Sequence, residues 1–212
     1  MQKHYGSLKK RKPPRSEALP RENTQSAERV MTVEAPTPTE KLLLGYRAPA
    51  FSHPDTAAHV LTSELLFGGR STRLHRSFCI DREIALSVRG SLSPFVEPGL
   101  FEIWIFVRHG CRRQEALTLL DEELDRLAAQ GPTAVELSKA AAQLELSFLH
   151  SMETAGGKAE QIGFYETVAN DGAAVFERLA DYREVTANDV QRVTQTYLRR
   201  SRRTRVEIVP SA

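Results

Sequence analysis

Apolar residues recur along the chain with two periods, one typical of strands and one typical of helices. Arg29–Val33 alternates polar and apolar residues, and the more apolar segment Lys41–Tyr46 follows after a proline-rich break. Ile84–Leu92 also alternates, and Leu100–Val107 is a dense run of β-branched and aromatic residues. We therefore expect four strands here, of which the last two form an antiparallel hairpin across a short loop.

Apolar residues at three- and four-residue spacing predict helices in the segments that follow these strands. The first helix begins after Asp55, a residue type that favours the N-cap, and ends at Gly68. A short helix is expected over Ser71–Phe78. Two long amphipathic helices cover Arg113–Gln130 and Thr133–Glu153, and the second opens with a Thr-x-x-Glu capping box.

The C-terminal part of the chain predicts three shorter helices and one strand. Helices over Lys158–Ala169 and Ala173–Tyr182 follow a break at two glycines, and Thr186 opens a last helix that runs to Tyr197. Arg203–Val209 returns as an edge strand. This order of elements predicts an α+β fold, in which helices pack on one face of an antiparallel sheet.

Composition divides the chain into a tail and one domain. Residues 1–25 are basic, contain prolines and almost no aliphatic residues, and are expected to be a disordered linker, whereas residues 26–212 form the α+β domain. The net charge of +2 favours neither nucleic acid nor an acidic substrate. No apolar run approaches the roughly 20 residues that span a bilayer, and no secretory signal opens the chain. We expect no membrane partner. The location stays open: it is cytoplasmic for the sequence as written, or periplasmic if the chain is part of a longer exported protein.

None of the six histidines stands in a zinc-peptidase motif. Both His-Glu-x-x-His and His-x-x-Glu-His are missing from the sequence, although catalytic zinc needs three protein ligands and a carboxylate that activates water. His53 and His59 have no glutamate between them, so we expect His53 to cap a helix and His59 to lie on its surface. The sequence predicts no catalytic residue, no metal ligand and no cofactor in this chain.

Other reactive residue types also lack the neighbours that catalysis requires. No Gly-x-Ser-x-Gly elbow occurs, and Cys79 and Cys111 are expected to be buried or incidental thiols. Gly68-Gly69 fits a corner between helices better than a phosphate-binding loop. The basic clusters Lys9–Lys12 and Arg199–Arg205 have no interleaved aromatic residues, so solvated termini are favoured over nucleic-acid binding.

Several segments share their order and spacing with one known family. They are Leu43–Pro49, His53–Asp55, Gly68–Phe78 with Ile84–Val88, and Val185–Leu198. Together they resemble the non-catalytic C-terminal domain of insulinase-type (pitrilysin-like) zinc metallopeptidases, and the Gly-Gly-Arg-Ser-Thr-Arg-Leu string that starts at Gly68 is the most specific match. The resemblance covers about residues 26–210, and Lys3–Ser7 is similar to the end of the domain that precedes it in that family.

The resemblance implies an accessory half of a peptidase. In that family two homologous α+β halves close around an extended peptide, and the N-terminal half holds zinc through His-x-x-Glu-His. The implied partners are therefore a zinc-binding half, which would hold the only zinc, and an unstructured peptide. Some members carry an assisting Arg and Tyr in the C-terminal half, but Cys79 and Leu86 stand at those positions here, and many bacterial relatives also lack the pair.

The same resemblance places the peptide along the sheet edge and the short helix Ser71–Phe78. The residues expected to face it are Arg70, Ser71, Arg73 and Leu74. Two functions remain open: the non-catalytic half of a peptidase, as a fragment or a separate subunit, and a stand-alone interaction or scaffold protein that kept the fold without the activity.

Removing residues 1–25 is expected to leave the rest of the chain folded, because this segment has too little apolar content to offset the entropy of ordering it. In a thermal unfolding scan, the melting temperature of the trimmed chain should stay within about 2 °C of that of the full chain. A larger drop would show that the segment packs on the domain.

Overall fold

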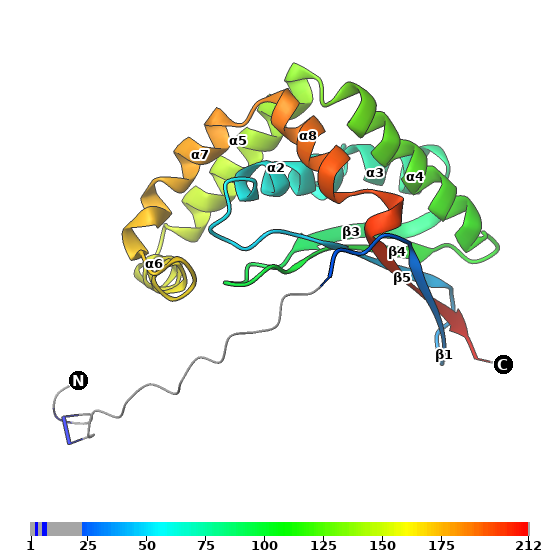
Figure 1. Cartoon of the computed structure of the whole chain (residues 1–212), viewed down its shortest axis with the longest axis horizontal. Helices are drawn as coiled ribbons and strands as arrows, with labels where there is room; N and C mark the ends of the chain where they lie inside the picture. Colours follow the sequence, from blue (N-terminus) through cyan, green and yellow to red (C-terminus); the bar gives the residue numbers. More distant parts are fainter. Residues whose placement is uncertain (1–2, 4–5, 8–22, 212) are drawn as a thin grey trace.

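The computed structural model describes residues 3, 6–7 and 23–211, and its elements form two layers, a sheet and a set of helices above it (Figure 1). The strands are β1 (Arg29–Ala35), β2 (Lys41–Arg47), β3 (Ala85–Leu92), β4 (Leu100–Val107) and β5 (Arg203–Pro210). The helices are α2 (Thr56–Phe67), α3 (Arg73–His75), α4 (Arg113–Gln130), α5 (Ala134–Ser151), α6 (Ala155–Ala169), α7 (Arg178–Glu184) and α8 (Ala187–Tyr197). Three short turns complete them: the π-helical η1 (Arg76–Asp81) and the 3-10 turns η2 (Gly172–Phe176) and η3 (Arg200–Arg202).

The five strands form one sheet in the order β1-β5-β2-β4-β3. The predicted α+β fold with helices on one face is confirmed, and so is the β3–β4 hairpin. The prediction that Arg203–Val209 is an edge strand is wrong, because β5 lies between β1 and β2. β1 runs parallel to β5, so the sheet is mixed rather than purely antiparallel. Charged residues in β5 gave it the sequence character of an edge strand.

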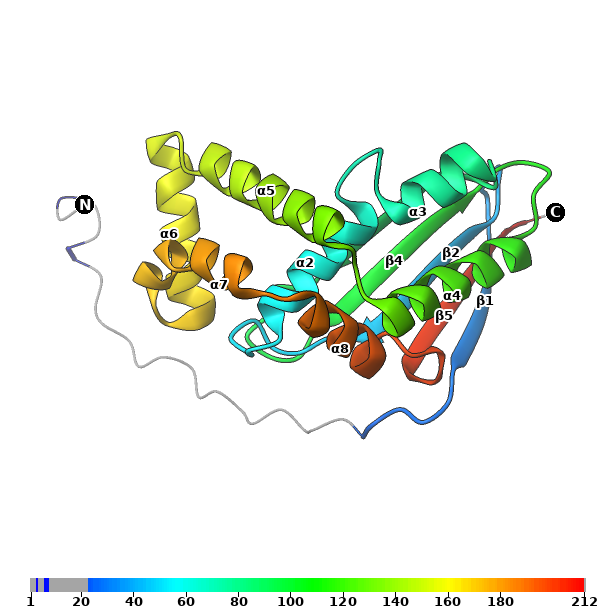
Figure 2. The same cartoon turned by 90° about the horizontal axis from the view of Figure 1, so that it is seen from above.

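The helix-facing side of the sheet is the core of the protein. Alternate residues of the central strands point there, because side chains in a strand alternate between the two faces. Those of β2 and β4 are almost completely inaccessible: Leu42, Leu44, Tyr46, Phe101, Ile103, Ile105 and Val107. They pack in one cluster with apolar residues of α2 and α4, among them Leu61, Leu66, Leu117 and Leu120. Seen from above, α5, α6 and α7 extend past one end of this layer (Figure 2).

The opposite side, which we call the open sheet face, is covered by no helix or strand of the described residues (Figure 1). Strand register places an apolar set on it: Met31, Val33, Leu43, Trp104, Phe106, Val206 and Ile208. The Trp104 and Phe106 rings stack with centroids 6.2 Å apart, and the cations of Lys41 and Arg89 lie 5.8 and 5.7 Å from the Phe106 centroid. Large contiguous apolar patches are uncommon on the surfaces of monomeric proteins.

Arg203 in β5 is the largest of the fully buried side chains. Its Nε donates to Glu28 at 2.5 Å, its two Nη atoms donate to the carboxylate of Asp121 on α4, and Nη1 lies 3.4 Å from the Tyr46 hydroxyl on β2. The expectation that Arg199–Arg205 is a solvated cluster is therefore wrong at Arg203. A buried charge is stable only when such partners surround it.

Helix boundaries differ from the sequence prediction mainly where short segments meet. The predicted helix Ser71–Phe78 is instead α3 followed by η1, and the predicted helix Ala173–Tyr182 is η2 followed by α7. The two glycines expected to break the chain lie inside α6, because Thr154 accepts a hydrogen bond from the Gly157 backbone and so caps the helix before them. None of the described helices is long and apolar enough to cross a membrane.

The predicted linker, residues 1–25, lies largely outside the described residues. Gln25 at its end is described, and its Nε2 donates to the Arg203 carbonyl at 2.5 Å. Gln25 thus contacts the first residue of β5.

Arg203→Met is expected to lower the free energy of unfolding by about 3 kcal/mol, because Glu28 and Asp121 would keep their charges without the guanidinium that pairs with them. Urea unfolding followed by circular dichroism measures this change. Arg200→Met is the matched control, since Arg200 also approaches Glu28, at 3.5 Å, but its side chain is 67% exposed. We expect it to change stability by less than about 0.5 kcal/mol. Similar unfolding midpoints for the two variants would contradict the role of Arg203.

Candidate functional site

The corner between α2 and β3, residues 68–78, contains all four residues predicted to face a peptide. Arg70 and Ser71 are exposed, and Lys139 on α5 donates a hydrogen bond to the Ser71 hydroxyl. Leu74 is fully buried in the core. Arg70 and Ser71 therefore stay predicted peptide contacts, whereas the side chain of Leu74 packs inside the protein.

Arg73, the fourth predicted residue, pairs with Glu136 at the start of α5. Its Nε and Nη2 donate to the two carboxylate oxygens of Glu136 at 2.6 and 2.7 Å, the bidentate geometry that a guanidinium favours. Glu136 also accepts from the backbone N–H of Thr133, so the predicted capping box is formed. The hydrogen bonds from Arg73 and then those from Thr133 hold the pKa of Glu136 at about 2. Arg73 thus fixes the corner against α5.

Cys79 and Leu86, which occupy the positions of the assisting Arg and Tyr, offer no charge to a substrate. Cys79 is a half-buried free thiol, and burial raises its pKa, which keeps it protonated at neutral pH. Leu86 is 59% exposed at an irregularity in β3, between Ala85 and Ser87. The structure therefore places no acid, base or nucleophile at these two positions.

A metal site would need several ligands to converge. In the part of the chain that the structure describes, no group of three His, Cys, Asp or Glu side chains is placed to hold a metal ion. The His53 Nδ1 accepts a hydrogen bond from the Asp55 backbone N–H at 3.1 Å, one residue ahead of α2, and it does not cap the helix itself. The prediction that His59 lies on a helix surface is wrong: it is fully buried, because α2 packs against both the sheet and α8.

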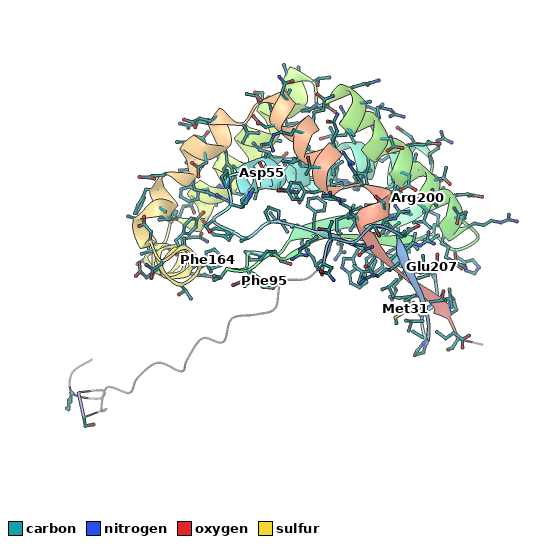
Figure 3. The ribbon with its side chains drawn as sticks, viewed as in Figure 1. Met31, Asp55, Phe95, Phe164, Arg200 and Glu207 are labelled. Carbon is teal, nitrogen blue, oxygen red and sulfur yellow. The ribbon has the colours of Figure 1, made fainter. Side chains whose placement is uncertain are left out.

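A polar cluster at the start of α2 joins this helix to α8. Asp55 does not cap α2 with its side chain. It accepts instead from Arg192 at 2.7 Å and from the Tyr197 hydroxyl at 2.8 Å, and Figure 3 shows it within the helical layer. Burial alone would raise the pKa of Asp55, but these hydrogen bonds lower it overall. Tyr197 stands 142 residues from Asp55, so no local sequence pattern could reveal the cluster.

His59 is the unusual member of this region. Its ring meets Tyr197 edge-on with centroids 4.5 Å apart, and neither ring nitrogen has a hydrogen-bond partner among the described residues. Burial lowers the pKa of His59 to about 4, although the nearby Asp55 opposes this shift. The imidazole is therefore neutral at physiological pH. In this setting it acts as a packed ring rather than as a base or a ligand.

Comparison with known proteins gives consistent matches. Residues 1–144 match the family model described as the peptidase M16 inactive domain. A zinc protease of Streptomyces coelicolor, described as uncharacterized, is 30% identical over 183 residues, which cover 85% of this chain and 39% of that protein. A protease from Helicobacter pylori is structurally similar, with a TM-score of 0.87 at 22% identity, over 99% of this chain and 51% of that chain.

Two further crystal structures are of inactive domains. The peptidase M16 inactive domain from Pseudomonas fluorescens matches with a TM-score of 0.81 at 20% identity, over 94% of this chain and 47% of that chain. The inactive peptidase domain from Bordetella parapertussis matches with a TM-score of 0.74 at 21% identity, over 84% of this chain and 95% of that chain. The chain thus spans about half, or less, of its longer relatives, and most of one inactive domain.

His59→Leu is expected to remove a pH-dependent loss of stability. The unfolded chain takes up a proton on this histidine below about pH 6.5, whereas the folded chain takes it up only near pH 4. Stability that is fully present above pH 6.5 is therefore lost as the pH falls towards 4, by up to about 3 kcal/mol. Urea midpoints at pH 7.5 and 4.5 should differ less for the variant than for the parent.

At pH 7.5 the same variant should be at least as stable as the parent, because two unpaired ring nitrogens leave the core. His150→Leu, which removes an exposed histidine at the end of α5, is the control and should keep the pH dependence of the parent. If His59→Leu keeps it as well, the buried imidazole is not its source.

Proposed function

The chain belongs to the family of peptidase M16 inactive domains, since the family model matches residues 1–144, and we propose that it is the non-catalytic half of an insulinase-type zinc metallopeptidase. In this proposal a homologous zinc-binding half, in the same polypeptide or as a separate subunit, closes on it to form a chamber for an unstructured peptide. The length comparison supports the proposal, because the chain corresponds to about half of the Helicobacter pylori protease.

The open sheet face is the observation that carries this proposal. Met31 on this face is 60% exposed and Val33 is 39% exposed, and Trp104 and Phe106 continue the same apolar surface across β4. Figure 3 shows Met31 at the end of the sheet that lies away from α6. Removing apolar surface of this extent from water is the main driving force of stable association. We therefore assign this face to contact with the zinc-binding half.

The peptide would lie along the edge of the sheet that β3 forms. β3 is an edge strand, and the free N–H and C=O groups of an edge strand can pair with an extended peptide. Arg70 and Ser71 belong to the corner that leads into η1, and η1 packs against β3. We propose that these two side chains contact the peptide, while Arg73 and Leu74 hold the corner in place.

The division of labour follows from the groups that each half contributes. Peptide hydrolysis needs an activated water and stabilisation of the tetrahedral oxyanion, and zinc in the partner half would supply both. This chain would supply surface that positions and confines the peptide, which lowers the entropic part of the barrier. The proposal thus gives this chain a role in binding and orientation.

The purified chain alone is expected not to cleave an unstructured fluorogenic peptide above background, even with added zinc. Mixing it with the homologous zinc-binding half from the same genome should raise cleavage above that of the zinc-binding half alone, and a chelator should abolish the gain. Chelator-sensitive cleavage by the chain alone would refute the non-catalytic role. No gain on mixing would favour the stand-alone scaffold protein.

Met31→Glu should weaken binding of the zinc-binding half by at least about tenfold, because it places a charge in the proposed apolar contact. Val135→Glu is the matched control: Val135 is 78% exposed on α5, in the helical layer, so the same change there should leave binding unaltered. Surface plasmon resonance with the immobilised zinc-binding half compares the two. Equal affinities would place the contact elsewhere.

A further inference from the structure

A cavity of about 420 Å³ opens between the start of α2 and the α6–α8 segment, away from the open sheet face and from residues 68–78. Small side chains leave the space, since four alanines from three separate elements line it: Ala57, Ala58, Ala169 and Ala174. A leucine at any of these positions would fill part of it.

Aromatic rings form one wall of this cavity. Phe51 and Tyr165 both line it and meet edge-on with centroids 5.3 Å apart. Tyr165 is only 7% exposed, yet its hydroxyl forms no hydrogen bond with any described residue. Burial raises the pKa of Tyr165 to about 12, so the group is a neutral hydroxyl that can donate and accept. This hydroxyl, on a largely buried side chain that lines an open cavity, is free to bind a polar group of a ligand.

The opposite wall is acidic. Glu177, the N-cap residue of α7, is followed at intervals of four and three residues by Asp181 and Glu184 of that helix, so the three lie on one side of it, and all line the cavity. Asp181 lies 3.7 Å from Arg178. Glu177 and Glu184 form no ion pair with any described residue, which leaves two uncompensated negative charges at the rim.

The two arginines of the cavity are already engaged. Arg178 lies between the rings of Phe51 and Tyr182, with its guanidinium carbon 5.1 and 5.0 Å from their centroids. Arg192 pairs with Asp55 at 2.7 Å and with Asp189 at 3.5 Å. Their charges are thus largely balanced by neighbours, and the net field of the lining favours a cation.

We propose that this cavity binds a lysine or arginine side chain of an extended peptide. The aliphatic part of such a side chain would lie on the alanine floor, and its cation would lie beside the Tyr165 ring, because Arg178 already covers Phe51, within reach of Glu177, Glu184 and the Tyr165 hydroxyl. That the side chain belongs to a peptide rests on the proposed function. The site would make peptides with a basic residue the preferred substrates.

Fluorescence anisotropy with three labelled ten-residue peptides of glycine and serine tests the proposal. The peptides differ only at one central residue, which is lysine, norleucine or glutamate. The lysine peptide should bind the chain about tenfold more tightly than the other two, as expected from an ion pair and a cation–π contact at a partly exposed site. The assay uses no zinc-binding half, so its failure leaves the proposed pairing untouched, and a failure of pairing leaves the peptide result untouched.

Three variants locate the site. Tyr165→Phe removes only the hydroxyl, Glu184→Gln removes one rim charge, and Ala174→Leu fills the cavity, and each should reduce the preference for lysine by at least about threefold. Glu122→Gln on α4 and Ala142→Leu on α5 make matched changes at exposed positions and should leave it unchanged. Tighter binding of the glutamate peptide, equal binding of all three, or a lysine preference that survives both Glu184→Gln and Ala174→Leu would overturn the proposal.

Discussion

The buried guanidinium of Arg203 is the interaction on which the two layers depend. It sits on β5, an interior strand of the sheet, and reaches Asp121 on α4 above it, Tyr46 on the next strand and Glu28 ahead of β1. Burial acts to lower the pKa of Arg203, but the hydrogen bond to Asp121 and the other contacts raise it overall, so the charge is retained. This one side chain therefore fixes β5 within the sheet, holds the segment before β1 close to β5, and fixes the position of α4 on the sheet. An apolar residue at position 203 could pack in the core, but it would form no ion pair with Glu28 or Asp121.

Two further ion pairs also join distant segments of the chain, in this case within the helical layer. Asp55 joins α2 to Arg192 of α8, and Arg73 joins the corner after α2 to Glu136 of α5. Both couple segments that lie far apart in the sequence. The helices are thus held over one face of the sheet, and no helix or strand of the described residues covers the other face.

The polar residues His59 and Glu136 have structural roles in this fold. His59 is buried as a neutral ring, and Glu136 is held ionised by Arg73, so neither is free to move a proton in a reaction. The cavity beside Tyr165 is the exception, since the Tyr165 hydroxyl and the carboxylates of Glu177 and Glu184 have no partner among the described residues.

Local pattern in the sequence determined the helices and strands, the α+β class, the capping box at Thr133 and the missing zinc motif, because each depends on residues close together in the chain. It did not determine the place of β5, where Arg203 gave the strand the polarity of an edge. It also placed His59 on a surface, since one residue does not reveal how many neighbours a helix has. Tertiary structure alone decided these points, together with the Asp55 cluster and the cavity lined by Tyr165, because they arise from contacts between residues that only folding brings together.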